Sequence, residues 1–209
     1  MESDNLLLLV AVVAVVIAMV GVGVTYNSLN VFSNLISGNA VESGLVQLNI
    51  SSNMQIEIIS ANGSTGSKTL DWGTGTVDAS ETALLVSNGT VTNSNFPNIT
   101  SGFIIENTGN VNVTLSLHAS KDASGFFSVP EGESLFQYNL TNYEPGSCVF
   151  SAETEGVWKN FTTTSTPVCT TFTYDIGDKI RLDILMSIPS SASPGSLTNT
   201  ITLTYEEAE

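Results

Sequence analysis

Basic residues are scarce in this sequence: five Lys and Arg stand against 20 Asp and Glu in 209 residues, which gives a formal net charge of −15. A nucleic-acid-binding surface needs Lys and Arg to neutralise phosphates, so this composition excludes nucleic acid as a partner. Charged residues make up only 12% of the chain and apolar residues 42%. A disordered acidic tail has the opposite balance, so we expect a folded protein.

Residue types that bind metals or act as nucleophile partners are also few, with one His and two Cys. These are too few for a zinc finger, an iron–sulfur site or a catalytic triad. Neighbouring acidic residues could offer oxygen ligands to Ca²⁺, but they lack the ordered spacing of an EF-hand loop. They are Asp175, Asp178 and Asp183, Glu131 and Glu133, and Glu153 and Glu155.

We therefore predict that these carboxylates form a solvated acidic surface. The sequence indicates no catalytic residue, no metal site and no cofactor, and we do not expect an enzyme. His118 falls on the polar side of an alternating segment, which favours a surface position. Trp72 is most simply interpreted as a core aromatic residue.

The longest apolar run is Leu6–Val24, 19 residues without a charge or a Pro. As a helix it would span roughly 28 Å, close to the hydrocarbon thickness of a bilayer. Because it is apolar on every face, such a helix has to be enclosed by lipid or by other protein. The many valines favour a strand, but strands seldom exceed about ten residues, so the length predicts a helix.

The residues before this run carry no base: Glu2 and Asp4 are acidic, and the first Lys or Arg is Lys68. A secretory signal peptide opens with basic residues, and a membrane anchor is held at its cytoplasmic end by Lys or Arg. We infer that the numbering starts at a processed N-terminus from which a basic leader has been removed. The alternative is that Met1 is the initiator and the segment is a membrane anchor.

After the run, the pattern changes to a single apolar stripe, in which Leu29, Phe32 and Ile36 recur at spacings of three and four. Ser37-Gly38-Asn39 is a typical helix end. We therefore predict a hydrophobic helix over residues 1–37 that is enclosed by lipid or by other protein. Its apolar positions include Leu6, Leu9, Val13, Ile17, Val20, Val24, Leu29, Phe32 and Ile36.

The remainder of the chain has the period-two pattern of strands with one buried face. Turn signals such as Asn62-Gly63, Asn88-Gly89 and Ser193-Pro194-Gly195 separate the strands, and we find no second helical pattern. The predicted strands are 46–50, 54–59, 83–86, 103–106, 111–118, 136–140, 169–174, 180–188 and 201–205. The predicted fold class is α+β, with one long N-terminal helix over 1–37 and an extracellular antiparallel Ig-like β-sandwich over 38–209.

Two further features point to export. Asn-x-Ser/Thr sequons predict an N-glycosylated surface, with unmodified polar residues as the alternative. The sequons are at Asn49, Asn62, Asn88, Asn98, Asn112, Asn139 and Asn160. Cys148 and Cys169 are the only cysteines. In an exported domain they predict a disulfide, with two buried free thiols as the alternative.

The layout of the whole chain resembles that of archaeal type IV pilins and archaellins, in which a polar prefix, an apolar helix, an amphipathic extension and a β-sandwich follow one another. In many of those proteins the mature chain has Ser at the third position and Glu at the fifth, before a Leu-rich run. This chain has Ser3, Asp4 and Asn5 before Leu6–Leu9, so an amide stands where the family has an acid. The segments ENTGNVNVTLSL (106–117) and PGSLTNTITLTY (194–205) are similar to sandwich domains of archaeal surface proteins.

The resemblance implies a structural subunit that leaves the cytoplasmic membrane and assembles with identical subunits into an extracellular helical filament. The helices, with membrane insertion before assembly and the apolar positions from Leu6 to Ile36 as oligomerisation residues, would form the filament core. The sandwiches would form its outer sheath, for adhesion or motility. Small residues such as Ala11, Ala14 and Gly21 would let neighbouring helices approach closely. The alternative is a membrane-anchored cell-surface glycoprotein.

Overall fold

Strands with one apolar face dominate the part of the chain that the computed structural model describes, which is residues 51–208 without 152–154 and 176. The clearest are β6 (Val113–Ala119) and β11 (Lys179–Pro189), in which every second residue is buried. The β-branched side chains of Val113 and Thr114 in β6 and of three Ile residues in β11 pack well on a pleated surface. The period-two pattern of the sequence therefore predicts both strands correctly.

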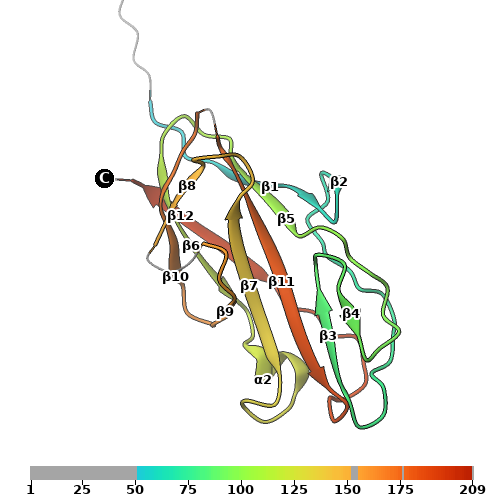
Figure 1. The fold of residues 1–209 in the computed structure, drawn as a ribbon. Coiled ribbons are helices and arrows are strands. Elements are labelled where there is room, and N and C mark those ends of the chain that lie inside the picture. The colour runs from blue at the N-terminus through green and yellow to red at the C-terminus, as the bar shows by residue number, and fades with distance from the viewer. Residues whose placement is uncertain (1–50, 152–154, 176, 209) are drawn as a thin grey trace, which may run out of the picture. The chain divides into compact units, whose positions relative to one another are not determined.

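One sheet is organised around β11, both edges of which are paired (Figure 1). β7 (Leu135–Asn142) pairs with one edge from Ile180 to Ser187. The other edge pairs first with β5 (Phe103–Asn107) and then with β3 (Thr82–Val86). Four further strands extend the sheet outward from these neighbours: β1 (Ile56–Ala61), β2 (Ser64–Thr65), β4 (Val91–Thr92) and β9 (Lys159–Asn160).

The second sheet has the order β12-β6-β10-β8, and its paired strands are antiparallel. Besides β6 it contains β8 (Cys148–Phe150), β10 (Thr166–Phe172) and β12 (Ile201–Glu207). Leu115 and Leu117 of this sheet share one buried cluster with Leu140 and Leu182 of the first sheet. Each such side chain contributes about 1.5–3 kcal/mol when fully buried, so the two sheets are held as a β-sandwich by their common core.

The short helix α2 (Ala123–Phe127) lies between β6 and β7. Asp122 caps its N-terminus, because its carboxylate accepts a hydrogen bond from the amide of Gly125 at 2.8 Å. The helix places the buried rings of Phe126 and Phe127 in contact, and Phe126 also contacts Phe136 of β7. The sequence shows no helical pattern at this place, because a five-residue helix is too short to show helical periodicity.

Two of the predicted turns are confirmed in detail. Asn62 and Gly63 join β1 to β2 with φ of 47° and 73°. Two successive positive φ values are typical of a two-residue hairpin turn that matches strand twist, and Asn-Gly is the preferred pair there. Gly89, between β3 and β4, has φ of 99°.

The predicted α+β class is wrong: strands account for 44% and helix for 3% of the described residues, which are nearly all β. The physical reason is that their apolar positions recur every second residue, which suits a strand rather than a helix. Within the described ranges, no helix is long and apolar enough to cross a membrane. The predicted helix over 1–37, with its oligomerisation residues from Leu6 to Ile36, lies outside the described residues, as do the strand predicted at 46–50 and the 37/38 domain boundary.

Candidate functional site

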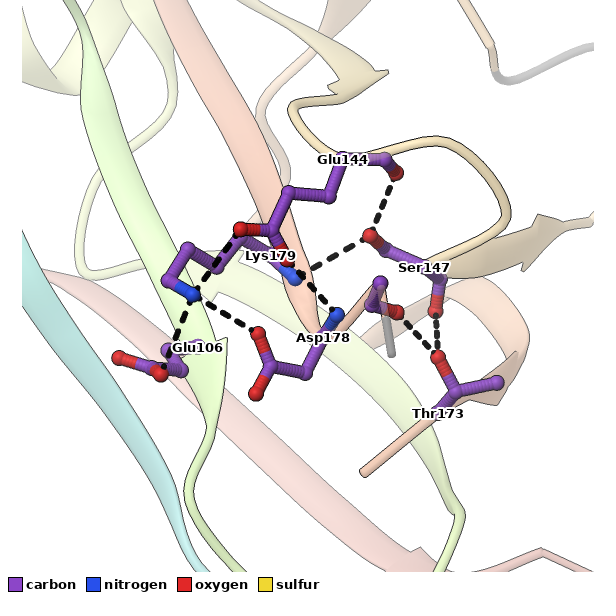
Figure 2. A network of polar contacts seen from close by, with 7 residues as sticks. Glu106, Glu144, Ser147, Thr173, Asp178 and Lys179 are labelled. Carbon is purple, nitrogen blue, oxygen red and sulfur yellow. Dashed lines mark hydrogen bonds and ion pairs between the residues drawn. The ribbon is translucent and has the colours of Figure 1, made fainter. Parts of the chain in front are cut away.

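Four charged side chains gather around the first residue of β11, and we call Glu106, Glu144, Asp178 and Lys179 the Lys179 cluster (Figure 2). The Nζ atom of Lys179 lies 3.0 Å from Oδ1 of Asp178, 3.1 Å from Oε1 of Glu144 and 3.4 Å from Oε1 of Glu106. The single ammonium group of Lys179 thus forms ion pairs with three carboxylates. The cluster retains two formal negative charges.

Strand register and loop contacts bring these residues together. Lys179 and Glu106 are directly opposite each other on β11 and β5, a position in which opposite charges stabilise a strand pair. Glu144 lies in the loop after β7, and its amide donates to the carbonyl of Lys179 at 3.1 Å. The amide of Asp178 in turn donates to Oε2 of Glu144 at 3.2 Å.

Ser147 and Thr173 lie beside the Lys179 cluster and continue its polar contacts (Figure 2). The buried Ser147 hydroxyl donates to the carbonyl of Glu144 at 2.6 Å and accepts from the amide of Lys179 at 3.1 Å. The Thr173 hydroxyl donates to the carbonyls of Ser147 and Gly177. The loop before β8 is therefore tied to the loop before β11.

Gly177 is required at this junction for two reasons. Its φ is +86°, which side-chain-bearing residues rarely adopt, and a Cβ there would lie 2.7 Å from the carbonyl oxygen of Pro145. The close approach of the two loops thus depends on the absence of a side chain.

The charges of the Lys179 cluster stabilise one another. Hydrogen bonds to Asp178 and then to Glu144 raise the pKa of Lys179 well above its ordinary value. The hydrogen bond from Lys179 is the main cause that holds the pKa of Glu144 below its ordinary value. The Lys179 side chain thus links the loop after β7 and the residue before β11 to strand β5 through ion pairs.

A second ion pair lies further along β11, on the same side as Lys179. Arg181 approaches Asp183 with Nε 2.8 Å from Oδ2, and the fully buried Ser87 donates its hydroxyl to Oδ1 of Asp183 at 2.7 Å. The Ser87 hydroxyl also accepts from the amide of Ile184 at 3.0 Å. Through Ser87, Asp183 thereby links the end of β3 to β11.

The carboxylates singled out in the sequence do not converge. Asp178 belongs to the Lys179 cluster and Asp183 to the Arg181–Asp183 pair, whereas Asp175 is exposed. Glu131, Glu133 and Glu155 are exposed on other loops, and Glu153 lies outside the described residues. Over the described part of the chain, no group of three or more His, Cys, Asp and Glu is arranged to hold a metal ion.

The disulfide prediction is confirmed: Cys148 and Cys169 are bonded to each other, and both are buried. They lie on the neighbouring strands β8 and β10 of one sheet. The disulfide of antibody domains instead joins the two sheets and packs against a Trp. This bond therefore fixes a sheet edge rather than the contact between sheets.

The described sequons differ in their exposure. Asn139 is half-buried in the middle of β7, which is paired on both edges. Asn49 lies outside the described residues. The exposed sequons are Asn62, Asn88, Asn98, Asn112 and Asn160.

His118 and Trp72 are both half-buried. His118 is on the outer face of β6, in agreement with its polar register, but its Nδ1 is enclosed and has no hydrogen-bond partner among the described residues. Trp72 packs against the margin of the core rather than inside it.

Sequence reasoning missed the Lys179 cluster, because Glu144 and Lys179 are 35 residues apart and no motif connects them. The composition could have indicated it. Because the chain has five Lys and Arg but 20 Asp and Glu, a Lys at the start of a buried strand is expected to attract several carboxylates.

Comparison with known proteins adds no relative: no protein-family profile, no characterised protein and no solved structure matches this chain.

Proposed function

We propose that this chain is a structural subunit of an extracellular filament that assembles through its apolar N-terminal segment and displays the β-sandwich on the outside. In this proposal the subunit resides in the cytoplasmic membrane before assembly, and its partners are identical copies of itself. The filament serves adhesion or motility. The proposal rests on the sequence layout and its resemblance to archaeal type IV pilins and archaellins.

The observation that carries the proposal is the contrast between the two parts of the chain. Residues 51–208, where described, have their own core, a disulfide, the Lys179 cluster and the Arg181–Asp183 ion pair. The sequence before them contains 19 consecutive residues without a charge. An acidic domain with its own core follows an uncharged apolar segment in the sequence. This supports display by the domain and association through the segment.

The character of the polar groups in the domain supports a display role rather than catalysis. The Lys179 cluster and the Arg181–Asp183 pair join strands and loops of the fold itself. Five sequons are exposed and available to a glycosylating enzyme. A disulfide that pins a sheet edge suits an oxidising environment outside the cell.

The proposal is tested by placing a charge in the apolar run of the full-length chain. An ion that is buried without a partner costs several kcal/mol, and in a polymer the cost recurs in every copy. We therefore expect Val13→Asp or Ile17→Asp to abolish filaments in electron micrographs of the secreted material. Val13→Leu and the polar-side change Asn30→Asp are the matched controls, and both should leave filaments of native diameter.

The alternative function, a membrane-anchored surface glycoprotein, makes a different prediction. Native protein would then remain in the membrane fraction and show no filaments, while the disulfide and the glycans would still be present. Filaments that persist in Val13→Asp would contradict a role for the apolar run in assembly.

A further inference from the structure

An open hollow of about 380 Å³ lies beside the Lys179 cluster, on the outer face of the first sheet. The β1–β2 hairpin lines one side of it with Ser60 and Thr65, and Tyr143 and Glu144, which follow β7, line the other. Ile104 of β5 lies between these two walls, since β5 is placed between β1 and β11 in the sheet. The volume is within the range of about 300–1,000 Å³ that is typical of ligand pockets.

Both walls of the hollow are held by backbone hydrogen bonds. The amides of Tyr143 and Glu144 both donate to the carbonyl of Lys179, at 3.0 and 3.1 Å. In the opposite wall, the amide of Gly66 donates to the carbonyl of Ile59 at 2.7 Å. A ligand therefore meets surfaces that are already ordered, which lowers the entropic cost of binding.

The hollow contains polar groups that the fold itself does not use. Within the described part of the chain, the hydroxyls of Ser60, Thr65 and Ser101 line the hollow and form no hydrogen bond. Tyr143 is 57% exposed, and its ring combines an apolar face with a polar hydroxyl. Each carboxylate oxygen of Glu144 accepts one hydrogen bond from the protein and has a second lone pair free.

The charges beside the hollow disfavour an anionic ligand. The three ammonium hydrogens of Lys179 face the three carboxylates of its cluster, so no donor remains for a phosphate or a carboxylate of the ligand (Figure 2). The two negative charges that the cluster retains also repel an anion. A purely apolar ligand is disfavoured too, because among the described lining residues only Ile59 and Ile104 supply aliphatic side chains.

We propose that this hollow binds an uncharged carbohydrate. In this arrangement the C–H face of the sugar packs on the ring of Tyr143. The sugar hydroxyls form hydrogen bonds with Glu144 and with the unpaired serine and threonine hydroxyls, because a hydroxyl can both donate and accept. The site lies within the described domain, so it does not depend on filament assembly.

The test is binding of the full-length chain, purified in a detergent without a sugar headgroup, to a printed array of oligosaccharides. The array carries neutral glycans that end in glucose, mannose, galactose or N-acetylglucosamine, and acidic glycans that end in sialic acid. We expect binding to neutral glycans, and an apparent affinity about tenfold lower for Tyr143→Ala because the ring is the largest apolar contact. The matched control is Tyr174→Ala, since Tyr174 is 45% exposed but is not among the described residues that line the hollow. This control should bind as the wild type does.

A second variant tests the contribution of a single hydroxyl. Thr65→Val keeps the shape of the side chain but removes its hydrogen-bonding group, so we expect binding to weaken by about threefold. Thr65 and Tyr143 are both exposed, so neither substitution should change Tm. An unchanged Tm separates the loss of a ligand contact from unfolding.

The proposal would be overturned if the wild type bound no neutral glycan, or if it bound sialylated glycans more tightly than neutral ones. Equal affinity of the wild type and Tyr143→Ala would also contradict it. A loss of binding in Tyr174→Ala as large as in Tyr143→Ala would show that the ligand lies elsewhere, which also overturns it. Filaments are assayed separately by electron microscopy, so the failure of this site and the failure of the filament proposal are distinguishable.

Discussion

Strands β11 and β12 have the same alternating sequence pattern, but their surroundings differ. In β11 five alternate apolar residues, from Ile180 to Ile188, are at most 9% exposed. Of the equivalent residues in β12, Ile201 and Leu203 are half-buried and Tyr205 is 40% exposed. β11 is paired on both edges and β12 on one. The alternation thus predicts a strand and its inner face, whereas coverage of that face depends on neighbours that are distant in the sequence.

The largest expected effect compares one leucine from each strand. Leu182 of β11 is 1% exposed, and its truncation leaves a cavity between the sheets. We expect Leu182→Ala to lower the free energy of unfolding by about 4 kcal/mol. Leu203→Ala removes the same atoms from a half-buried site and should cost about 1 kcal/mol. Urea denaturation measures both, and equal losses would show that the two strands are equally covered.

The next effect concerns the opposite edge of the β12 sheet. The three-residue strand β8 is held there by the Cys148–Cys169 disulfide, which closes a loop of 21 residues. We expect the double variant Cys148→Ala/Cys169→Ala to lose about 3 kcal/mol, which lowers Tm by roughly 6–12 °C. Differential scanning calorimetry of the variant and of the reduced wild type should agree. An unchanged Tm would mean that β8 is held by its other contacts.

The smallest expected effect depends on pH and concerns the Lys179 cluster. The pKa of Glu144 is lowered from 4.5, so its stabilising contribution is present above pH 4.5 and is lost as the pH falls through the folded-state pKa. The pKa of Lys179 is raised from 10.5, so its contribution is complete below pH 10.5 and is lost at higher pH. We therefore expect Glu144→Gln to lower Tm at pH 7 but not at pH 3.

The control for this pH effect is Glu131→Gln, a substitution at an exposed carboxylate of another loop. It should change Tm little at either pH, because an exposed charge is screened by solvent. A Tm difference for Glu144→Gln that is the same at pH 3 and pH 7 would show that the side chain acts through packing and not through its charge.

Eight of the described strands, two of the hairpin turns and the disulfide could be predicted from the sequence because each depends on neighbouring residues or on composition. The two- and three-residue strands β2, β4, β8 and β9 were not predicted, since they are too short to show alternation. β6 is an example, since Val113, Leu115 and Leu117 alternate with polar residues and are buried as expected. Asn62-Gly63 likewise determines its own turn.

The features that could not be predicted depend on long-range contacts or are very short. Helix α2 is fixed by one capping Asp and by the ring of Phe136, which follows ten residues after Phe126. The Lys179 cluster depends on the register of β5 against β11. The α+β class was wrong because it rested on the length of one apolar run, whereas the described residues are nearly all β.

The central claim is that association depends on the N-terminal segment and that the β-domain folds without it. Deletion of residues 1–37 tests this claim most directly, because it removes the apolar run and retains all of the described domain. The account predicts a soluble, folded and monomeric protein by analytical ultracentrifugation, with the Cys148–Cys169 disulfide formed and no filaments in electron micrographs. Fibres of native diameter from the truncated protein would contradict the account, as would a truncated protein that fails to fold.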